Sequence, residues 1–491
     1  MPKTCEALFS GIECSIIGNR RVEVSGIAYR SDSVNPGDAF FCIVGLKVDG
    51  HSFAQAAIDA GAKVLVVERK VYLADASEVT EVVVSDTRKA MALCAANFYD
   101  HPCDSLGLVG ITGTNGKTTT TYLVDQIARF AGKKTGIIGT VGVAILENKE
   151  KISHTTPESP DLQGILARMR DAGCEVVAME VSSHALDLER SWGIRFAVSA
   201  FTNLSRDHLD YHKTFEAYFE AKARLFSAEY PAKRVIRIDD AWGKELFARC
   251  SKAKDAIITT GFAKAADIHP LEVSYGQDST TLTLEALGKS YHFSYPLVGK
   301  FNVDNLMCAF AIGLHLGFEA EGIVEALRAA PSVPGRLERV NAGVESGFSV
   351  FVDYAHTPDA LEKAIASVKE VSAGNLIVVF GCGGDRDSSK RSIMGRAALR
   401  ADFAIVTSDN PRSEDPLAII EDILPGMAGD PSRFTVEPDR RAAIALAISK
   451  ARAGDSVLIA GKGHEDYQLV GNAILSFDDV AVAKEELQKA F

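Results

Sequence analysis

One short segment of the chain has the residue types and spacing of a phosphate-binding loop. It reads Gly113-Thr114-Asn115-Gly116-Lys117-Thr118-Thr119, follows a strand-like apolar run at 106–112, and precedes a helix-like segment. Backbone N–H groups of such a loop bind phosphate oxygens, Lys117 can reach the outer phosphates, and the Thr118 hydroxyl can ligate Mg²⁺. Ile111 stands where the commoner motif has its first glycine, so the spacing is the G-x-x-G-K-T variant. The segment predicts a nucleotide-binding loop; a glycine turn capping a structural helix is the alternative.

Two later segments carry side chains that could bind a metal. Glu180 ends an apolar strand-like run, where a carboxylate can ligate a phosphate-bound cation or simply be a solvated acid. Residues 203–212 hold two aspartates and two histidines, Asp207, His208, Asp210 and His212. Because helix caps and surface charges explain most such residues, we expect about one ligand in this segment.

The elements that position these residues follow an alternating pattern. Short β-branched runs alternate with longer helix-like segments, which is typical of βαβ units and parallel sheets. Breaks near 101–105 and 331–335 predict three domains, at 1–104, 105–333 and 334–491. In such sheets ligands gather at the carboxyl ends of the strands. Expected strands are 63–68 and 81–86 in the first domain, 106–112, 134–139, 175–181 and 196–202 in the second, and 375–380, 403–407 and 456–460 in the third.

Length and composition agree with a folded multidomain protein. The chain has 491 residues, which favours about three domains, and 47% apolar with 24% charged residues is ordinary globular composition. A net charge of −12 argues against nucleic acid or an anionic membrane as partner. Nine scattered cysteines without a C-x-x-C pair, and no leader-like or membrane-spanning apolar run, predict a cytoplasmic protein.

Seven segments together resemble the Mur ligase family. They recur in order over some 350 residues: the loop at 113–118, then 179–184, 203–212, 301–305, 334–336, 353–359 and 461–465. The resemblance implies an α/β fold of three domains, in which a central P-loop ATPase-type parallel sheet is flanked by an N-terminal UDP-binding domain and a C-terminal Rossmann-like domain. It also implies a ligase that forms a carbon–nitrogen bond in cytoplasmic peptidoglycan precursor synthesis, and so acts in cell wall biogenesis, cell shape and cell division.

The same resemblance implies a substrate pair and a reaction. ATP phosphorylates the carboxylate of UDP-N-acetylmuramoyl-L-alanyl-D-glutamate, and meso-2,6-diaminopimelate attacks the acyl phosphate through its amine. The residues implied for catalysis are Lys117, Glu180, His208 and Lys222. Thr118, Glu180, His208 and Lys222 would bind Mg²⁺, with Lys222 carbamylated by CO₂ because an ammonium cannot ligate a cation. Without the resemblance, Lys222 would be taken for a solvated helix residue, and the helical apolar spacing at 217–226 does not distinguish the two interpretations.

The resemblance also assigns binding residues. Asn305, Arg336 and Asp353 match adenine and ribose contacts, although Arg336 alone would be taken for a surface arginine. The muramoyl dipeptide side is implied at Ser31, Thr155, Thr156, Ser182 and Arg190. The chain departs from many relatives at Arg30, Asp32 and Leu188, which changes the expected uridine and peptide contacts.

The amine-binding residues are implied in the third domain. Asp409-Asn410-Pro411-Arg412 matches the diaminopimelate type of a motif, with Arg386, Gly461 and Glu465 in the same pocket. The planar guanidinium of Arg412 suits the distal carboxylate that lysine lacks, and Glu465 suits the distal ammonium. An ordinary Asp-Asn-Pro turn is the alternative interpretation of the motif.

Two other functions are possible on the same residues. Folylpolyglutamate synthetase shares the loop and the acyl phosphate chemistry, but has no reason to carry a uridine-binding first domain or residues 409–412. A nucleotide-gated binding or scaffold protein would need fewer metal-binding positions. We expect a monomer that binds only small molecules.

Overall fold

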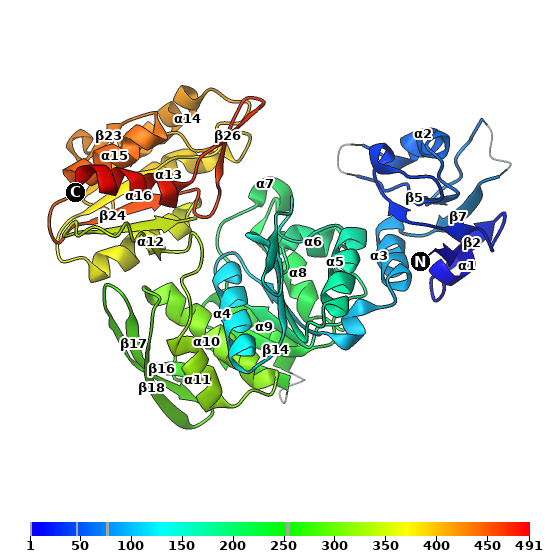
Figure 1. Ribbon diagram of the computed structural model, residues 1–491, viewed down its shortest axis with the longest axis horizontal. Helices are drawn as coiled ribbons and strands as arrows, with labels where there is room; N and C mark the ends of the chain where they lie inside the picture. The colour runs from blue at the N-terminus through cyan, green and yellow to red at the C-terminus, as the bar shows by residue number, and fades with distance from the viewer. Residues whose placement is uncertain (1, 46–47, 75–77, 252–255) are drawn as a thin grey trace. The chain divides into compact units, whose positions relative to one another are not determined.

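The computed structural model describes residues 2–45, 48–74, 78–251 and 256–491 of the chain. Their helices and strands are labelled in Figure 1. By their internal contacts these residues divide into two compact units. The first unit comprises Met1–Thr112, Gly132–Ser199 and Ala221–Lys233, and the second comprises Gly113–Ala131, Ala200–Glu220 and Arg234–Phe491.

The first unit begins with a five-stranded sheet of order β2-β7-β6-β5-β4, covered on both faces. Apolar residues alternate between two cores: Phe41 and Val66 lie with helix α3, whereas Phe40 and Val67 lie with α2. This alternation is expected of strands buried on both faces. The elements are β2 (Cys14–Ile17), β4 (Ile27–Ala28), β5 (Ala39–Phe41), α2 (Ala54–Asp59), β6 (Val64–Val67), β7 (Thr80–Val84) and α3 (Thr87–Phe98).

A second run of strands in the first unit leads to the candidate site. Its order is β11-β10-β9-β12-β8, with β12 parallel to both β8 and β9 and with β10 and β11 folding back as antiparallel strands. In the β12–β8 register Glu180 lies opposite Ile111, so Glu180 occupies a carboxyl end of the parallel strands. The elements are β8 (Gly107–Thr112), β9 (Thr135–Gly139), β10 (Gly142–Ile145), β11 (Asn148–Glu150), α5 (Ser159–Asp171), β12 (Val176–Glu180) and α6 (Ser183–Asp187).

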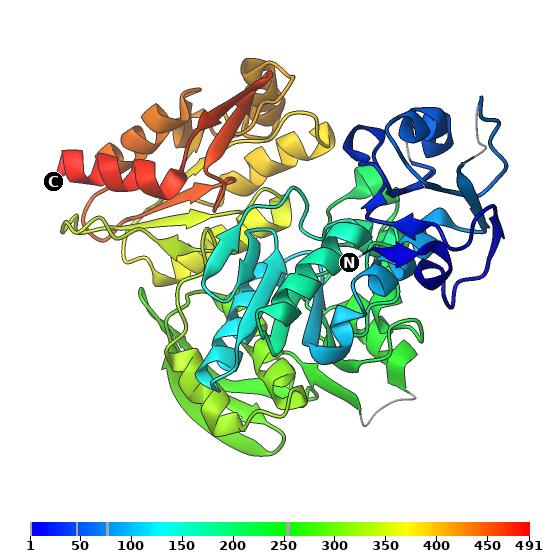
Figure 2. The ribbon, with the colours of Figure 1, turned by 45° about the vertical axis from the view of Figure 1, so that its right-hand side comes forward.

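The second unit contains the helix that follows the glycine loop, α4 (Lys117–Phe130), which packs against α10 (Lys300–His315) and α11 (Ala320–Arg328). Strands β14 (Lys233–Arg237) and β15 (Ile257–Thr260) are parallel. Three longer antiparallel strands, β16 (Ile268–Tyr275), β17 (Thr280–Ala286) and β18 (Lys289–Tyr295), lie against α10 and α11 (Figure 2). Strand β13 (Val198–Phe201) and helices α7 (Leu209–His212), α8 (Phe215–Ala223) and α9 (Ala241–Cys250) complete the middle of the chain.

The C-terminal part of the second unit is a three-layer α/β/α arrangement. Its six strands have the order β19-β20-β24-β21-β22-β23, and all neighbours except β19–β20 are parallel. One core joins the sheet to α12, α13 and α14, and a second core joins it to α15 and α16. The bounds are β19 (Glu338–Arg339), β20 (Ser349–Asp353), α12 (Pro358–Val371), β21 (Leu376–Phe380), α13 (Arg391–Ala398), β22 (Phe403–Val406), α14 (Pro416–Ile423), β23 (Phe434–Val436), α15 (Arg440–Lys450), β24 (Ser456–Ala460), β25 (Tyr467–Val470), β26 (Ala473–Ser476) and α16 (Asp479–Ala490).

The nine strands expected from the sequence are confirmed, each within two residues of its expected bounds. The antiparallel strands β16–β18 and the hairpin β25–β26 were not predicted, because their exposed faces interrupt the apolar runs that mark buried parallel strands.

Candidate functional site

The glycine loop has the backbone shape of an anion site. Gly113 and Gly116 have φ of +150° and +86°, and helix α4 begins directly after them at Lys117. The Lys117 ammonium donates to the carbonyl oxygens of Gly113 (2.8 Å) and Thr114 (2.9 Å), so it lies over the loop itself. The N–H groups in the first turn of a helix, with a lysine folded over them, attract phosphate oxygens.

Residues 202–205 hold the glycine loop in this shape. The Asn203 side chain accepts from the Asn115 N–H (3.0 Å) and donates to the Asn115 carbonyl (3.0 Å), and the Thr202 hydroxyl donates to the same carbonyl (2.6 Å). A Cβ on Gly113 would lie 1.9 Å from the Thr202 hydroxyl oxygen, so only glycine fits there. The Asn115 amide also donates to Asp359, at 3.0 Å, in the first turn of α12.

The amide of Asn305 touches the other end of the loop. A Cβ on Gly116 would lie 2.2 Å from Asn305 Oδ1. The Asn305 amide nitrogen donates to Asn302 Oδ1 (3.1 Å), and the Asn302 amide donates to the Val298 carbonyl (2.8 Å), so both amides are fixed at the start of α10. Asn302 lies within a motif noted in the sequence, yet it was not predicted as a site residue.

Arg336 lies at the phosphate side of the loop. Its guanidinium donates to the Thr118 hydroxyl, at 3.0 Å, and stacks over the ring of Tyr354, at 4.5 Å. Asp353 accepts from the backbone N–H groups of Leu337 (2.7 Å) and Ala355 (2.8 Å), and burial raises the pKa of its carboxyl. Asp353 therefore holds the backbone beside Arg336, while nucleotide contacts of both residues stay a prediction.

His208 and His212 have different surroundings. His212 is buried, with its ring 4.8 Å from that of Tyr211 and 5.1 Å from that of Tyr218. His208 is partly exposed, and its ring meets the edge of Tyr218, whose hydroxyl lies 3.1 Å from the Thr114 hydroxyl. Of the two histidines, His208 is thus the one placed to reach a ligand near the loop.

The predicted residues of the first unit around Glu180 come together. The Glu180 carboxylate, 1% exposed, accepts from the Thr140 N–H (2.9 Å) and the Thr140 hydroxyl (3.1 Å). The Thr155 hydroxyl also contacts Thr140 (3.1 Å), and the Thr156 hydroxyl bonds the Glu180 carbonyl (2.9 Å). Ser182 donates its N–H to that hydroxyl and caps α6, and Arg190 donates to the Thr156 carbonyl (3.0 Å).

Two other predicted residues of this unit lie in different settings. Lys222, near the end of α8, is 1% exposed, which corrects the solvated position expected of a helix lysine without the resemblance. It is buried together with Tyr218, Phe219 and Ala221 of the same helix, which the apolar spacing did not reveal. Ser31 begins a short 3-10 turn, Ser31–Ser33, where the exposed side chains of Arg30 and Asp32 pair with each other.

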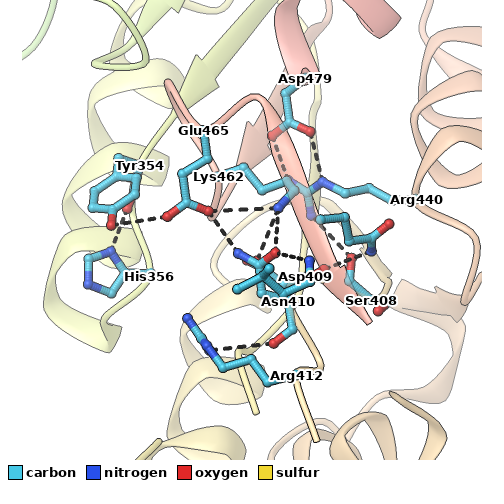
Figure 3. Close-up of polar contacts among 12 residues, drawn as sticks. Tyr354, His356, Ser408, Asp409, Asn410, Arg412, Arg440, Lys462, Glu465 and Asp479 are labelled. Atoms are coloured by element: carbon cyan, nitrogen blue, oxygen red, sulfur yellow. Dashed lines mark hydrogen bonds and ion pairs between the residues drawn. The ribbon is translucent and has the colours of Figure 1, made fainter. Parts of the chain in front are cut away.

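The predicted amine-binding residues converge in the second unit, at the carboxyl ends of β22 and β24 (Figure 3). Asn410 donates to Glu465 Oε2 (2.8 Å) and accepts from Lys462 (3.0 Å). The Arg412 guanidinium donates to the Gly384 carbonyl (2.7 Å), in the loop that also carries the exposed Arg386. A Cβ on Gly461 would lie 2.5 Å from Asp409 Oδ2, so the two loops touch. The Glu414 N–H donates to the Pro411 carbonyl (3.1 Å), so the motif is also a turn.

A completely buried ion pair lies behind this pocket. Arg440 Nε and Nη2 donate to the two Asp479 oxygens at 2.8 and 2.6 Å, and Nη2 also donates to the Ala460 carbonyl at 3.1 Å (Figure 3). The sequence analysis missed Arg440, Asp479 and Lys462 as parts of the pocket. For Lys462, the only signal in the sequence was the glycine-rich run at 461–465. No sequence feature distinguished Arg440 from its exposed neighbour Arg441.

Comparison with known proteins assigns the chain to a family. The parallel sheets and the glycine loop define a nucleotide-binding α/β protein. Family models match the chain at 23–99 (Mur ligase family, catalytic domain), 111–313 (Mur ligase middle domain) and 335–463 (Mur ligase, glutamate ligase domain). The UDP-N-acetylmuramoyl-L-alanyl-D-glutamate--2,6-diaminopimelate ligase of Syntrophomonas wolfei is 45% identical over 471 residues, which is 95% of each chain. The chain belongs to the Mur ligase family.

Solved structures agree with this assignment. A UDP-N-acetylmuramoyl-L-alanyl-D-glutamate--2,6-diaminopimelate ligase structure is 34% identical, with a TM-score of 0.71 over 100% of this chain and 99% of that one. Folylpolyglutamate synthase of Mycobacterium tuberculosis, complexed with ADP and AMPPCP, shares the fold at 19% identity, with a TM-score of 0.62 over 81% and 93% of the chains. The expected α/β fold class is confirmed. Within the described part of the chain, no helix combines the length and apolarity that a membrane crossing needs.

We predict that Gly116→Ala weakens ATP binding about tenfold or more, because its Cβ collides with Asn305 Oδ1 and strains a backbone at φ +86°. Isothermal titration with ATP measures the change. Gly132→Ala is the matched control, since it has φ +75° at the other end of α4 but nothing within 4 Å of its Cβ. Equal ATP affinity in the two variants would show that Asn305 does not define the nucleotide site.

Proposed function

We propose that this chain joins meso-2,6-diaminopimelate to UDP-N-acetylmuramoyl-L-alanyl-D-glutamate with hydrolysis of ATP to ADP and phosphate. The observation that carries the proposal is the pocket of Asn410, Arg412 and Glu465, in a chain 45% identical to a ligase of that name. A carboxylate-binding arginine beside a carboxylate suits an amino acid whose far end bears both an ammonium and a carboxylate.

The reaction needs an activated carboxylate, because a free carboxylate is a poor electrophile. The γ-phosphoryl group passes from ATP to a carboxylate oxygen of the dipeptide, and ADP leaves. The amine nitrogen then attacks the acyl carbon, phosphate leaves with its oxygen, and the nitrogen loses a proton. Lys117 and the adjacent N–H groups of the loop would neutralise charge on the transferring phosphoryl group. Arg336, which contacts Thr118, lies on the same side of the loop.

Two Mg²⁺ ions would be held, one by Thr118 and Glu180 and a second by His208 and by Lys222 as its carbamate. The described residues include no cluster of three or more His, Cys, Asp or Glu side chains suited to a metal ion. That fits Mg²⁺, which is usually held by one or two carboxylates together with substrate phosphates and water. Lys222 and Glu180 are both 1% exposed, and Glu180 supplies a carboxylate, as the carbamate of Lys222 would. Bound Mg²⁺ would offset phosphate charge.

The nucleotide sugar would bind in the first unit. One hydrogen-bonded group with Glu180 is formed by Thr155, Thr156, Ser182 and Arg190, which favours the proposed dipeptide contacts. Ser31 would contact the uridine side.

We also propose domain boundaries at 104/105 and 333/334, which agree with family matches at 23–99, 111–313 and 335–463. The chain would act as a cytoplasmic monomer, for which sedimentation should give a mass of 52.6 kDa.

The amine specificity would come from Arg412, with Arg386, Asp409, Gly461 and Glu465 around it. Lysine lacks the distal carboxylate, so it would leave the Arg412 guanidinium without its partner in a partly buried site. Unpaired polar groups of this kind give large discrimination between substrates.

The test of the reaction is phosphate release from ATP and the UDP-dipeptide with each candidate amino acid. We expect release and a lengthened product only with diaminopimelate, and none with Lys117→Ala, because Lys117 faces the phosphates. Lys133→Ala, which removes a surface lysine paired with Glu175, should keep full activity. Activity with a folate substrate would favour folylpolyglutamate synthetase instead, and ATP binding without turnover would favour a scaffold.

Arg412→Ala should raise the KM for diaminopimelate about tenfold or more and change the KM for ATP much less, because the distal carboxylate loses its partner. Steady-state kinetics with each substrate varied in turn measures both constants. Arg441→Ala, an exposed arginine on α15, should change neither. Equal rises in the two constants would mean that residues 409–412 are only a turn.

Lys222→Ala should lose about a hundredfold in activity and recover part of it with a small carboxylic acid such as propionate, which can replace the carbamate. Rate measurements against propionate concentration test this. Lys117→Ala serves as the control, because its proposed role is that of a cation and a carboxylate cannot replace it. No recovery in Lys222→Ala would remove the carbamate from the proposal.

A further inference from the structure

Lys462 has no part in the reaction as described so far, yet its side chain is completely buried. It follows strand β24 between two glycines with positive φ, Gly461 (+119°) and Gly463 (+54°), and its exposed fraction is 0%. Burial lowers the pKa of its ammonium. Removing an ammonium from water is costly unless nearby groups compensate, so its contacts show what it stabilises.

The Lys462 ammonium contacts three side chains of the amine pocket (Figure 3). It donates to Asn410 Oδ1 at 3.0 Å and lies 3.7 Å from Glu465 Oε2 and 3.8 Å from Asp409 Oδ1. All three belong to the predicted pocket, two in the loop after β22 and one in the loop after β24. Lys462 thus joins the two loops from the buried side.

These contacts give the Asn410 amide a single orientation. Its oxygen accepts from Lys462 and from the Leu469 N–H (2.9 Å), so its nitrogen must point the other way. That nitrogen donates to Glu465 Oε2 at 2.8 Å. If the amide were turned by half a rotation, its nitrogen would face two donors, the Lys462 ammonium and the Leu469 N–H. Its oxygen would then face the Glu465 carboxylate, and both arrangements are unfavourable.

Lys462 also balances the charges of the pocket. Burial and the neighbouring Asp409 raise the pKa of Glu465, so two carboxylates compete for the same small volume. Tyr354 contacts the other Glu465 oxygen (3.4 Å), and Arg440 is already paired with Asp479. Arg412 and the Tyr467 ring complete the surroundings of Glu465. The Lys462 ammonium is therefore the cation that Asp409 and Glu465 share at less than 4.0 Å.

We propose that Lys462 is a positioning residue for amine recognition: its buried ammonium orients the Asn410 amide and thereby fixes the Glu465 carboxylate that receives the distal ammonium of the substrate. The proposal rests on the proposed function for the identity of that substrate. Lys462 itself does not contact the amino acid, because its ammonium lies behind Asn410 and Glu465.

The first test is Lys462→Met, which keeps the apolar stem and removes the donor. We expect the KM for diaminopimelate to rise about tenfold or more, with the KM for ATP changed less than about twofold. The acid limb of kcat/KM for diaminopimelate should move to higher pH, because Glu465 loses its cation and protonates more readily. Lys489→Met, which removes an exposed ammonium from α16, should match the wild type in every measurement.

A double-mutant cycle with Asn410→Ala separates positioning from general damage. If Lys462 acts through Asn410, the double variant should have nearly the KM of Asn410→Ala alone, whereas fully additive effects would overturn the proposal. Equal rises in both KM values, or an unchanged pH profile, would overturn it too. Urea unfolding checks the fold. If Lys462→Met does not fold, Lys462→Gln replaces it: its amide is neutral, so the acid limb should still move to higher pH, and an unchanged acid limb would overturn the proposal.

A crystal structure of Lys462→Met tests the geometry without any assay. We expect the Asn410 amide to have turned or moved away from Glu465, and an unchanged contact would overturn the proposal. This keeps the two proposals distinguishable: a wild-type chain inactive with diaminopimelate would refute the proposed function, while the structure of the variant would still decide the role of Lys462.

Discussion

The main constraint on this protein is that charged side chains must be held, with little water, at the carboxyl ends of parallel strands. Arg440 is an example of such a side chain. Its guanidinium is completely buried, binds both oxygens of Asp479, and donates to the carbonyl of Ala460 at the end of β24. A buried pair of this kind adds little net stability compared with apolar side chains, but it is costly to break. Its contribution is therefore better understood as fixing where the strands end and the pocket loops begin.

The same loops also connect the amine pocket to the nucleotide loop. A Cβ on Gly335 would lie 2.1 Å from the His464 N, and one on Gly463 would lie 2.7 Å from the Tyr354 Cβ. Three backbone segments therefore pass each other at distances that only glycine permits. Arg336 follows Gly335 and contacts Thr118, whereas Glu465 follows His464 and contacts Asn410. A shift at this crossing would move the residue that contacts Thr118 and the residue beside His464 together, which would suit the proposed reaction because its activated intermediate must not reach water.

Sequence patterns predicted those structural features that depend only on residues close together in the chain. The nine predicted strands are apolar runs, and the glycine loop is defined by seven successive residues, so these were found with their positions, although the buried parallel strand β20 was not predicted. The burial of Lys222 and Lys462 could not be found in this way, because it depends on segments far away in the chain. Helical spacing at 217–226 did not separate a buried from an exposed Lys222, and the lysine itself favoured the exposed position that the structure corrects. The long strands β16–β18 were missed since one of their faces is polar.

Residues 409–412 show why a turn and a binding site are not competing interpretations. The Glu414 N–H bonds the Pro411 carbonyl as in a turn, and Arg412 has a φ of +53°, which a side chain seldom adopts without support. That support comes from the Leu469 carbonyl, which accepts the Arg412 N–H at 3.0 Å, and from the Gly384 carbonyl, which holds its guanidinium. The turn reverses the chain so that the Asn410 amide contacts Glu465 in the loop after β24, whereas the Arg412 guanidinium lies against Gly384 in the loop after β21. The backbone shape favoured by Asp-Asn-Pro thus brings Asn410 to Glu465 and Arg412 to Gly384, so the same turn would also build the proposed pocket.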